Sequence, residues 1–305
     1  MFLLVKSKTN ADENINFSHD NIRMEAELLL YGLVAFPDIL GLIFYSSKTE
    51  FQKSQFGSLT VYSLGSYPTK KSVLLVSGGD RLEFHGYIRK FVDDMNFDCN
   101  VYCCENLNNY NMLCIDEMVA FVKSLGKVQL TIIGFSLGGV IGSHIVSRLN
   151  QRTKLITVDT PYNFPESSLE YYDNFRYWRI DIIGLYWQAV AHSGSMDYRD
   201  WCDATSLRGY ALFIERKYGI SYKEFKRVNR MNPHLTNCRV ISVYSCRDPL
   251  VYRPVHRDIL AKFRLDLDPS SSYEEYEYSY PSHCSVMACD RCNRSFYEQI
   301  RSFLV

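Results

Sequence analysis

One short segment combines a hydroxyl group with a pattern that could make it a nucleophile. The sequence Gly-Phe-Ser-Leu-Gly places Ser136 between Gly134 and Gly138 in a G-x-S-x-G motif. The motif follows an apolar, β-branched run at 128–133 and precedes residues 139–149, which carry apolar side chains at helical spacing. At such a strand-to-helix turn the serine hydroxyl projects above the sheet, and a Cβ in place of either glycine would collide with the neighbouring strand and helix. This context favours a nucleophilic serine over a serine that only caps a helix.

The elements around this motif alternate between strands and helices. Strands are expected at 58–63, 72–76, 99–104, 128–133, 154–158, 239–244 and 274–280. Helices are expected at 86–95, 111–125, 139–149, 255–263 and 292–304. Between 162 and 237 the sequence is aromatic, charged and helical in character, without clear strands. The pattern predicts an α/β fold, in which a mostly parallel central sheet has helices on both faces and carries a helical cap insertion.

The motif around Ser136 and the alternation of elements resemble the α/β-hydrolase superfamily. The resemblance implies a hydrolase core made of residues 58–161 and 238–305, with a helical cap or lid at 162–237. Residues 1–57 fall outside the resemblance and are expected to form an N-terminal extension that packs partly on the core.

The same resemblance implies the catalytic partners of Ser136. In this superfamily the nucleophile is followed along the chain by an acid and then by a histidine, and His283 comes just after the last expected strand. Two carboxylates are candidates for the acid. Asp248 follows the next-to-last expected strand in an Asp-Pro-Leu-Val sequence, which resembles the family's acid loop, and Asp159 follows the strand before it. We expect the triad Ser136, Asp248 and His283, with Asp159 as the alternative acid.

An oxyanion hole requires two backbone N–H groups near the nucleophile. The resemblance assigns the first to Leu137, the residue after the serine, and the second to the loop Ser77-Gly-Gly-Asp80 that follows an earlier strand. Gly78 and Gly79 would let this backbone approach the substrate closely. Ser77 stands where the family usually has a histidine, which leaves the second donor open.

Composition limits the classes of protein that this chain could belong to. It has 305 residues, 47% of them hydrophobic, and a formal net charge of zero, so it can form a large core. The neutral charge argues against nucleic-acid binding. No cofactor is expected, and no metal site either, because Cys289-x-x-Cys292 lacks a second pair of the kind that zinc sites use.

Cysteine usage and hydropathy bear on the location of the protein. The ten cysteines are expected to be free thiols in a cytoplasmic protein, because residues 1–5 are too short for a secretory signal. Residues 26–45 are apolar and long enough to span a bilayer, but Pro37-Asp38 divides them and favours two packed elements. Peripheral contact of this segment with a membrane stays open.

The resemblance implies acyl transfer to water through an acyl-enzyme on Ser136. The expected activity is that of a serine esterase or lipase, with a small acyl ester or a lipid such as an acylglycerol as substrate. Aromatic residues in 162–237 favour an apolar wall for an acyl chain, or simply pack the cap on the sheet. The alternatives are a thioesterase, acyltransferase or peptidase on the same fold, and an inactive hydrolase-fold protein that binds a lipid or a partner.

Overall fold

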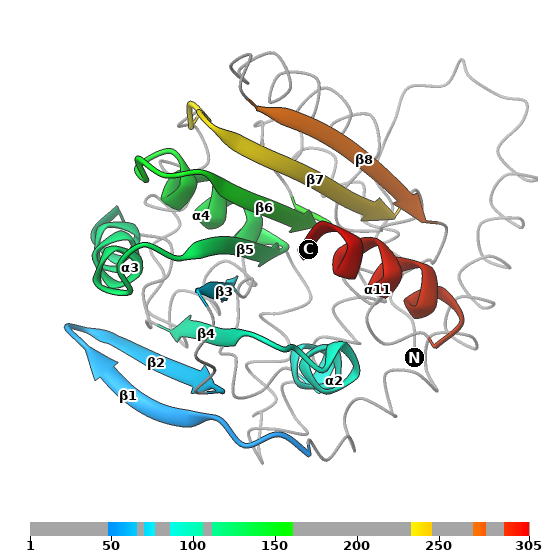
Figure 1. Cartoon of the computed structure of the whole chain (residues 1–305), viewed down its shortest axis with the longest axis horizontal. Coiled ribbons are helices and arrows are strands. Elements are labelled where there is room, and N and C mark those ends of the chain that lie inside the picture. Colours follow the sequence, from blue (N-terminus) through cyan, green and yellow to red (C-terminus); the bar gives the residue numbers. More distant parts are fainter. Residues whose placement is uncertain are drawn as a thin grey trace, which may run out of the picture.

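The computed structural model of the protein describes residues 48–65, 70–76, 86–105, 112–160, 233–245, 271–278 and 290–304. These residues form an eight-stranded sheet with helices packed on it (Figure 1). The strands are β1 (Gln52–Phe56), β2 (Leu59–Leu64), β3 (Lys71–Val76), β4 (Asn100–Glu105), β5 (Gln129–Phe135), β6 (Thr153–Val158), β7 (Cys238–Ser245) and β8 (Ser272–Tyr278). The helices in this part of the chain are α2 (Gly86–Met95), α3 (Met112–Ser124), α4 (Leu137–Val146) and α11 (Asp290–Leu304).

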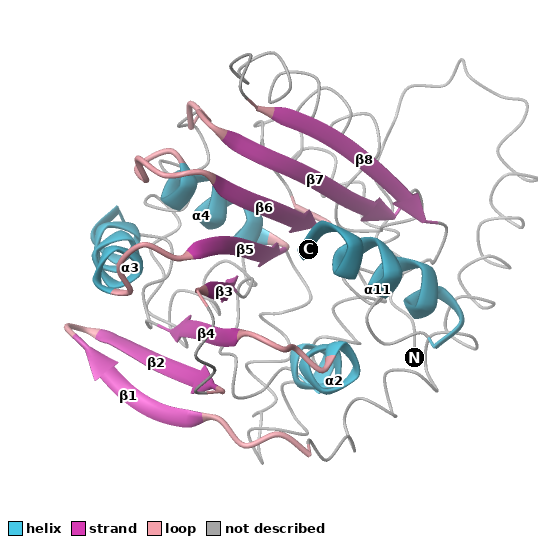
Figure 2. Ribbon diagram, in the orientation of Figure 1, coloured by secondary structure: helices cyan, strands magenta, loops and turns pink. Residues whose placement is uncertain are grey.

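The sheet is mostly parallel. Its strand order is β1-β2-β4-β3-β5-β6-β7-β8, and every pair from β4 to β8 is parallel. β1 and β2 form an antiparallel hairpin that joins the sheet through β4 (Figure 2). Because parallel strands end at the same edge, β3, β5, β6, β7 and β8 have their carboxyl ends together.

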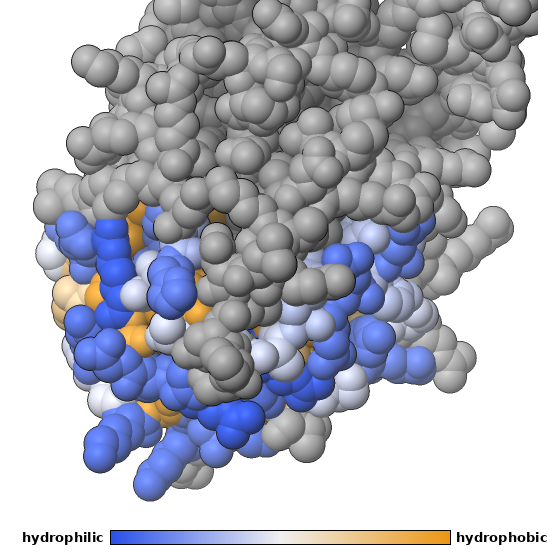
Figure 3. All heavy atoms as spheres, turned by 90° about the horizontal axis from the view of Figure 1, so that it is seen from above, coloured by the Kyte–Doolittle hydropathy of each residue, from blue (hydrophilic) through white to orange (hydrophobic). Residues whose placement is uncertain are grey.

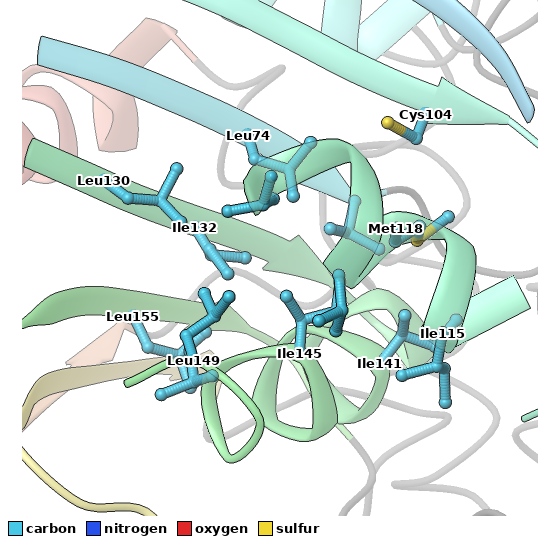
Figure 4. Packing of buried hydrophobic residues seen from close by; sticks show 14 of the residues in the cluster. Leu74, Cys104, Ile115, Met118, Leu130, Ile132, Ile141, Ile145, Leu149 and Leu155 are labelled. Atoms are coloured by element: carbon cyan, nitrogen blue, oxygen red, sulfur yellow. The ribbon is translucent and has the colours of Figure 1, made fainter. Parts of the chain in front are cut away.

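Helices α3 and α4 cover one face of the sheet. Ile115 and Met118 from α3 and Ile141 and Ile145 from α4 pack in one cluster with alternate residues of the strands, such as Ile132 (Figure 4). The other residues of the same strands point to the opposite face. This two-sided burial explains why the centres of β3, β5 and β6 carry apolar residues at consecutive positions.

Helices α2 and α11 cover the second face. Phe91 of α2 and Phe296 of α11 are fully buried there, and their ring centroids lie 6.2 Å apart. Phe135 at the end of β5 packs edge-to-face on Phe91, with ring centroids 5.6 Å apart. On the outer surface, the described side chains visible in Figure 3 are mainly hydrophilic.

The elements agree closely with those expected from the sequence. The helix after Ser136 begins at Leu137 and ends at Val146, earlier at both ends than the expected 139–149, and Ser136 and Ser147 are its N-cap and C-cap residues. Gly126, with φ of 78°, ends α3 as its sequence position predicts. The expected helix at 255–263 and the expected cap at 162–237 lie outside the described residues.

Candidate active site

Ser136 occupies the turn between β5 and α4 with a backbone conformation that non-glycine residues rarely adopt. Its φ is 52° and its ψ is −126°. The residue is held there by two backbone hydrogen bonds: its N–H donates to the carbonyl of Val158 at 2.8 Å, and its carbonyl accepts from the N–H of Gly139 at 3.0 Å. Such conformations cost on the order of 1–3 kcal/mol and persist only where the surrounding structure imposes them.

The hydroxyl of Ser136 is not used to cap the helix. Ser136 is the N-cap residue of α4, yet its side chain makes no capping hydrogen bond. The residue is partly exposed. A serine kept only to cap a helix would accept a hydrogen bond from a first-turn N–H group, so the geometry argues against the capping interpretation.

Glycines around Ser136 are required by close backbone packing. A Cβ on Gly134 would lie 2.5 Å from the carbonyl oxygen of Gly138 and from Cα of Gly139, closer than real Cβ atoms approach. A Cβ on Gly139 would overlap the side chain of Thr160, which lies in the turn after β6. The predicted steric reason for the first motif glycine is therefore confirmed.

The amino end of α4 lies directly beside Ser136. Leu137 is the first residue of the helix, so its N–H belongs to the first-turn groups that have no partner within the helix. These groups and the helix dipole favour negative charge at this point. The backbone of Leu137 thus stands in the environment expected for an oxyanion donor.

Asp159 lies next to the serine turn and is completely buried. Phe135 and Val158 are paired in β5 and β6, and Ser136 and Asp159 are the residues that follow them. Asp159 has a φ of 45°, and its N–H donates to the carbonyl of Val243 at 2.9 Å. Its relative exposure is 0%. Asp159, the alternative acid, therefore lies beside the turn that contains Ser136.

Tyr278, at the end of β8, is a site residue that sequence reasoning missed. Its hydroxyl donates a hydrogen bond to Oδ2 of Asp159. The sequence signal was weak, because Tyr278 is one of several tyrosines in the last expected strand and the contact joins residues far apart in the chain. Only the sheet order, with β7 between β6 and β8, brings the two residues together.

Several solved structures that are similar to this chain are named as esterases, and one is named as a phospholipase. No protein-family model matches the sequence, and no curated protein matches it either. A bacterial membrane phospholipase A is similar in structure with a TM-score of 0.53 at 13% identity, over 94% of each chain. An esterase from Pyrococcus furiosus has a TM-score of 0.51 at 12% identity, over 84% of this chain and 90% of its own. The chain has the α/β-hydrolase fold.

A third structure shares this hydrolase fold. The carboxylesterase CesB from Bacillus subtilis has a TM-score of 0.50 at 14% identity, over 90% of this chain and 98% of its own. The expected architecture, a mostly parallel sheet with helices on both faces, is confirmed. At these identities the likeness shows the fold.

Several of the predicted site residues lie outside the described residues: Gly78, Gly79, Asp248 and His283. The strands that lead to them are described. β3 ends at Val76, which is paired with Gly134 beside the serine turn. β7 and β8 end at the paired residues Ser245 and Tyr278. These three strand ends therefore lie at the same edge of the sheet as Ser136.

The described cysteines are free and buried, as expected. They are Cys99, Cys103, Cys104, Cys114 and Cys238. Burial raises the pKa of Cys114 and of Cys238 from 9.0 to about 12, so both thiols stay protonated and unreactive at neutral pH. Within the described residues, no group of three or more His, Cys, Asp or Glu side chains could hold a metal, and Cys289 lies outside them.

The sequence also left open whether the protein contacts a membrane. No helix in the described part of the chain is both long enough and apolar enough to cross a bilayer. The apolar segment 26–45 lies outside that part.

Proposed function

We propose that this protein is a serine hydrolase that cleaves carboxylic esters through an acyl-enzyme on Ser136. The observation that carries the proposal is the conformation of Ser136: a strained turn at the carboxyl edge of a parallel sheet, with a hydroxyl that caps nothing and the amino end of α4 beside it. A fold that only needed a tight turn here would be more stable with glycine at this position.

The mechanism uses residues in three roles. The hydroxyl of Ser136 attacks the ester carbonyl while His283 takes its proton and Asp248 orients the imidazole. The oxyanion that forms is stabilised by the N–H of Leu137 and a second N–H from the loop with Gly78 and Gly79. The intermediate collapses, and the alcohol leaves with the proton from His283. Water then attacks the acyl-enzyme, with His283 as the base, and releases the carboxylic acid.

Asp159 is the alternative to Asp248 as the acid. Its position after β6, next to the serine turn, supports a role near the nucleophile. Its carboxylate already accepts a hydrogen bond from the hydroxyl of Tyr278 within the core. We therefore assign Asp159 to supporting the turn and keep Asp248 as the acid.

The substrates we propose are lipid or acylglycerol esters. The structural similarity to a protein named as a membrane phospholipase A and to carboxylesterases supports ester substrates. The aromatic sequence at 162–237, proposed as the cap, supports an apolar acyl group. The free, buried cysteines support a reducing, cytoplasmic location, with membrane contact through 26–45 as part of the same proposal.

A substrate series tests the proposed function. Purified protein is assayed on p-nitrophenyl esters of increasing acyl length and on the matching acyl-coenzyme A thioesters. We expect ester cleavage in the wild type and its loss in Ser136→Ala. Ser147→Ala is the matched control, because Ser147 lies at the far end of α4 and its hydroxyl bonds the carbonyl of His144 at 2.9 Å. Faster cleavage of thioesters than of esters at every chain length would replace the esterase assignment with a thioesterase.

A further inference from the structure

A cavity of about 690 Å³ lies at the edge of the sheet opposite Ser136. Its walls come from the amino ends of the parallel strands. Lys71 is the first residue of β3, Gln129 is the first residue of β5, and Lys154 and Arg239 are the second residues of β6 and β7. The serine turn follows the carboxyl ends of these strands. The cavity and Ser136 are therefore separated by the length of the strands.

The cavity brings together cations from distant parts of the chain. Five basic side chains line it: Lys71, Arg152, Lys154, Arg239 and Arg301. Among the described lining residues the only acid is Asp98. Sheet register places Lys154 and Arg239 together on the face that α2 and α11 cover, because Lys154 is paired with Arg239 on one side and with Thr131 on the other. Acidic residues elsewhere in the sequence offset these positive charges. The formal net charge of zero therefore gives no sign of the cluster.

Contacts between α11 and its neighbours hold three of these cations in place. The ammonium of Lys154 donates to the carbonyl of Phe303 at 2.6 Å, and the guanidinium of Arg239 stacks on the Phe303 ring at 4.6 Å from its centroid. Arg301 donates to the carbonyl of Asp94 at 2.9 Å. Arg239 also pairs with Glu274 at 2.8 Å. Apart from the Glu274 pair, these contacts orient the cations without neutralising them.

The positive charges act on one another across the cavity. The pKa of Lys154 is lowered, first by burial and then by the charges of Arg239, Lys71 and Arg152. The three positive charges therefore act on Lys154 in the same direction as its burial does. An anion in the cavity would relieve this repulsion and raise the pKa of Lys154 toward its ordinary value.

The remaining walls suit an organic group rather than a bare ion. Met95 and Phe97, at the end of α2, and Leu304, at the end of α11, give the cavity an apolar side. Its volume falls within the range of roughly 300–1,000 Å³ typical of small-molecule sites. A single inorganic phosphate would leave most of this space and most of the cations unused.

We propose that this cavity binds a small organic molecule that carries two or more phosphate groups. Arginine recognises phosphate oxygens with paired N–H groups, and lysine adds a compact charge, so clustered phosphates match this lining. The phosphates bind Lys71, Arg152 and Lys154, and the organic part lies against Phe97 and Leu304. Both a free nucleotide and the headgroup of an inositol lipid have this chemistry. The site is separate from the proposed esterase centre and does not depend on it.

Binding of ATP and of inositol 1,4,5-trisphosphate, measured by calorimetry on the full chain, tests the proposal. We expect saturable binding of at least one probe that weakens steeply with salt, and no binding of adenosine. The probe that binds more tightly identifies the source of the phosphates. Ser136→Ala should bind as the wild type does, because Ser136 lies at the other edge of the sheet.

Variants locate the binding. The double variant Lys71→Gln/Arg152→Gln should weaken it by about tenfold or more, through the loss of two charge-assisted contacts. Arg152→Gln alone changes an exposed residue, so it tests the site even if the double variant folds poorly. Lys53→Gln/Lys123→Gln is the control, since these lysines lie on β1 and α3 away from the cavity. Failure of both probes to bind saturably, or equal affinity in all variants, would overturn the proposal.

Discussion

The hydroxyl of Tyr278 donates a hydrogen bond to the carboxylate of Asp159 and so ties the end of β8 to the turn after β6. Asp159 directly follows Val158, whose carbonyl accepts the N–H of Ser136 at 2.8 Å. A short chain of contacts therefore runs from the last strand of the sheet to the backbone of the serine. Through it, the strained turn at Ser136 is supported from a strand that is not its neighbour.

Removing the Tyr278 hydroxyl tests this support. In Tyr278→Phe the buried carboxylate of Asp159 loses a donor, and we expect a loss of about 1–3 kcal/mol in the free energy of unfolding. Urea unfolding measures the change. Tyr244→Phe is the control, because its hydroxyl makes longer hydrogen bonds, at 3.3 Å to Glu277 and 3.5 Å to Glu275, near the surface. Equal losses of stability in the two variants would mean that the hydrogen bond between Tyr278 and Asp159 gives the serine turn no special support.

The two candidate acids are separated by comparing kcat with stability. Asp248→Asn should lower kcat by about 10³–10⁴ and leave stability nearly unchanged, as expected for loss of the group that orients the histidine. Asp159→Asn should lower the stability and leave kcat nearly unchanged, because Asp159 is completely buried and hydrogen-bonded to Tyr278. Esterase kinetics and thermal melting of the same preparations decide between them. The opposite pattern would make Asp159 the acid.

Packing around the serine turn predicts that its first glycine cannot be replaced. Gly134→Ala puts a methyl group 2.5 Å from the backbone of the first turn of α4, which has to move, and we expect a loss of stability of about 2–4 kcal/mol. Gly142→Ala is the matched control in the middle of α4. Its Cβ would meet the side-chain atoms of Ile132 at 3.1 Å and of Leu155 at 3.3 Å, which can shift, and alanine favours the helix.

Denaturant unfolding of both glycine variants measures the difference. We expect the effect of Gly142→Ala to stay within about 1 kcal/mol of zero. A Gly134→Ala protein as stable as Gly142→Ala would show that Gly134 does not lie close to the backbone of Gly138 and Gly139.

Much of this fold could be predicted because its central strands are buried on both faces. The centres of β3, β5 and β6 carry apolar residues at consecutive positions, so the places of these strands follow from the sequence alone. β1 was missed, since its sequence Gln-Lys-Ser-Gln-Phe is almost wholly exposed at the edge of the sheet and has no apolar pattern. The serine turn was predicted correctly because its constraint is local, within a few residues of Ser136.

Contacts between distant strands were beyond sequence reasoning. The bond between Tyr278 and Asp159 depends on the strand order, and each partner alone is an ordinary residue near a strand end. Lys154 and Arg239, two of the cations around the cavity, lie near the amino ends of different strands, and only the register places them side by side. One sequence gives the alternation of strands and helices but not their order in the sheet.

The buried thiols predict a loss of stability at alkaline pH. Burial raises the pKa of Cys99 to about 11 and of Cys114 and Cys238 to about 12, from an ordinary value of 9.0, and it raises the pKa of Cys104 as well. Above pH 9 the unfolded chain loses these protons while the folded protein keeps them. The stability is therefore complete below pH 9 and falls as the pH rises toward 11–12.

Urea unfolding at pH 8 and pH 10, with a reductant, measures this loss. Above pH 9, each fully buried thiol lowers the free energy of unfolding by about 1.4 kcal/mol per pH unit. Cys104→Ala/Cys114→Ala should have a shallower slope than the wild type, although its stability at pH 8 is lower because both side chains belong to the core. A wild type whose stability does not change between pH 8 and pH 10 would contradict the assignment of these thiols as buried and protonated.

Covalent labelling with a fluorophosphonate probe tests the central claim most directly. The probe bonds only to a serine whose hydroxyl is activated by a base, and it requires no knowledge of the substrate. We predict that the wild type and the control Ser147→Ala are labelled, while Ser136→Ala and His283→Ala are not. Absence of labelling in folded wild-type protein, or labelling that survives Ser136→Ala, would contradict the assignment of Ser136 as an activated nucleophile.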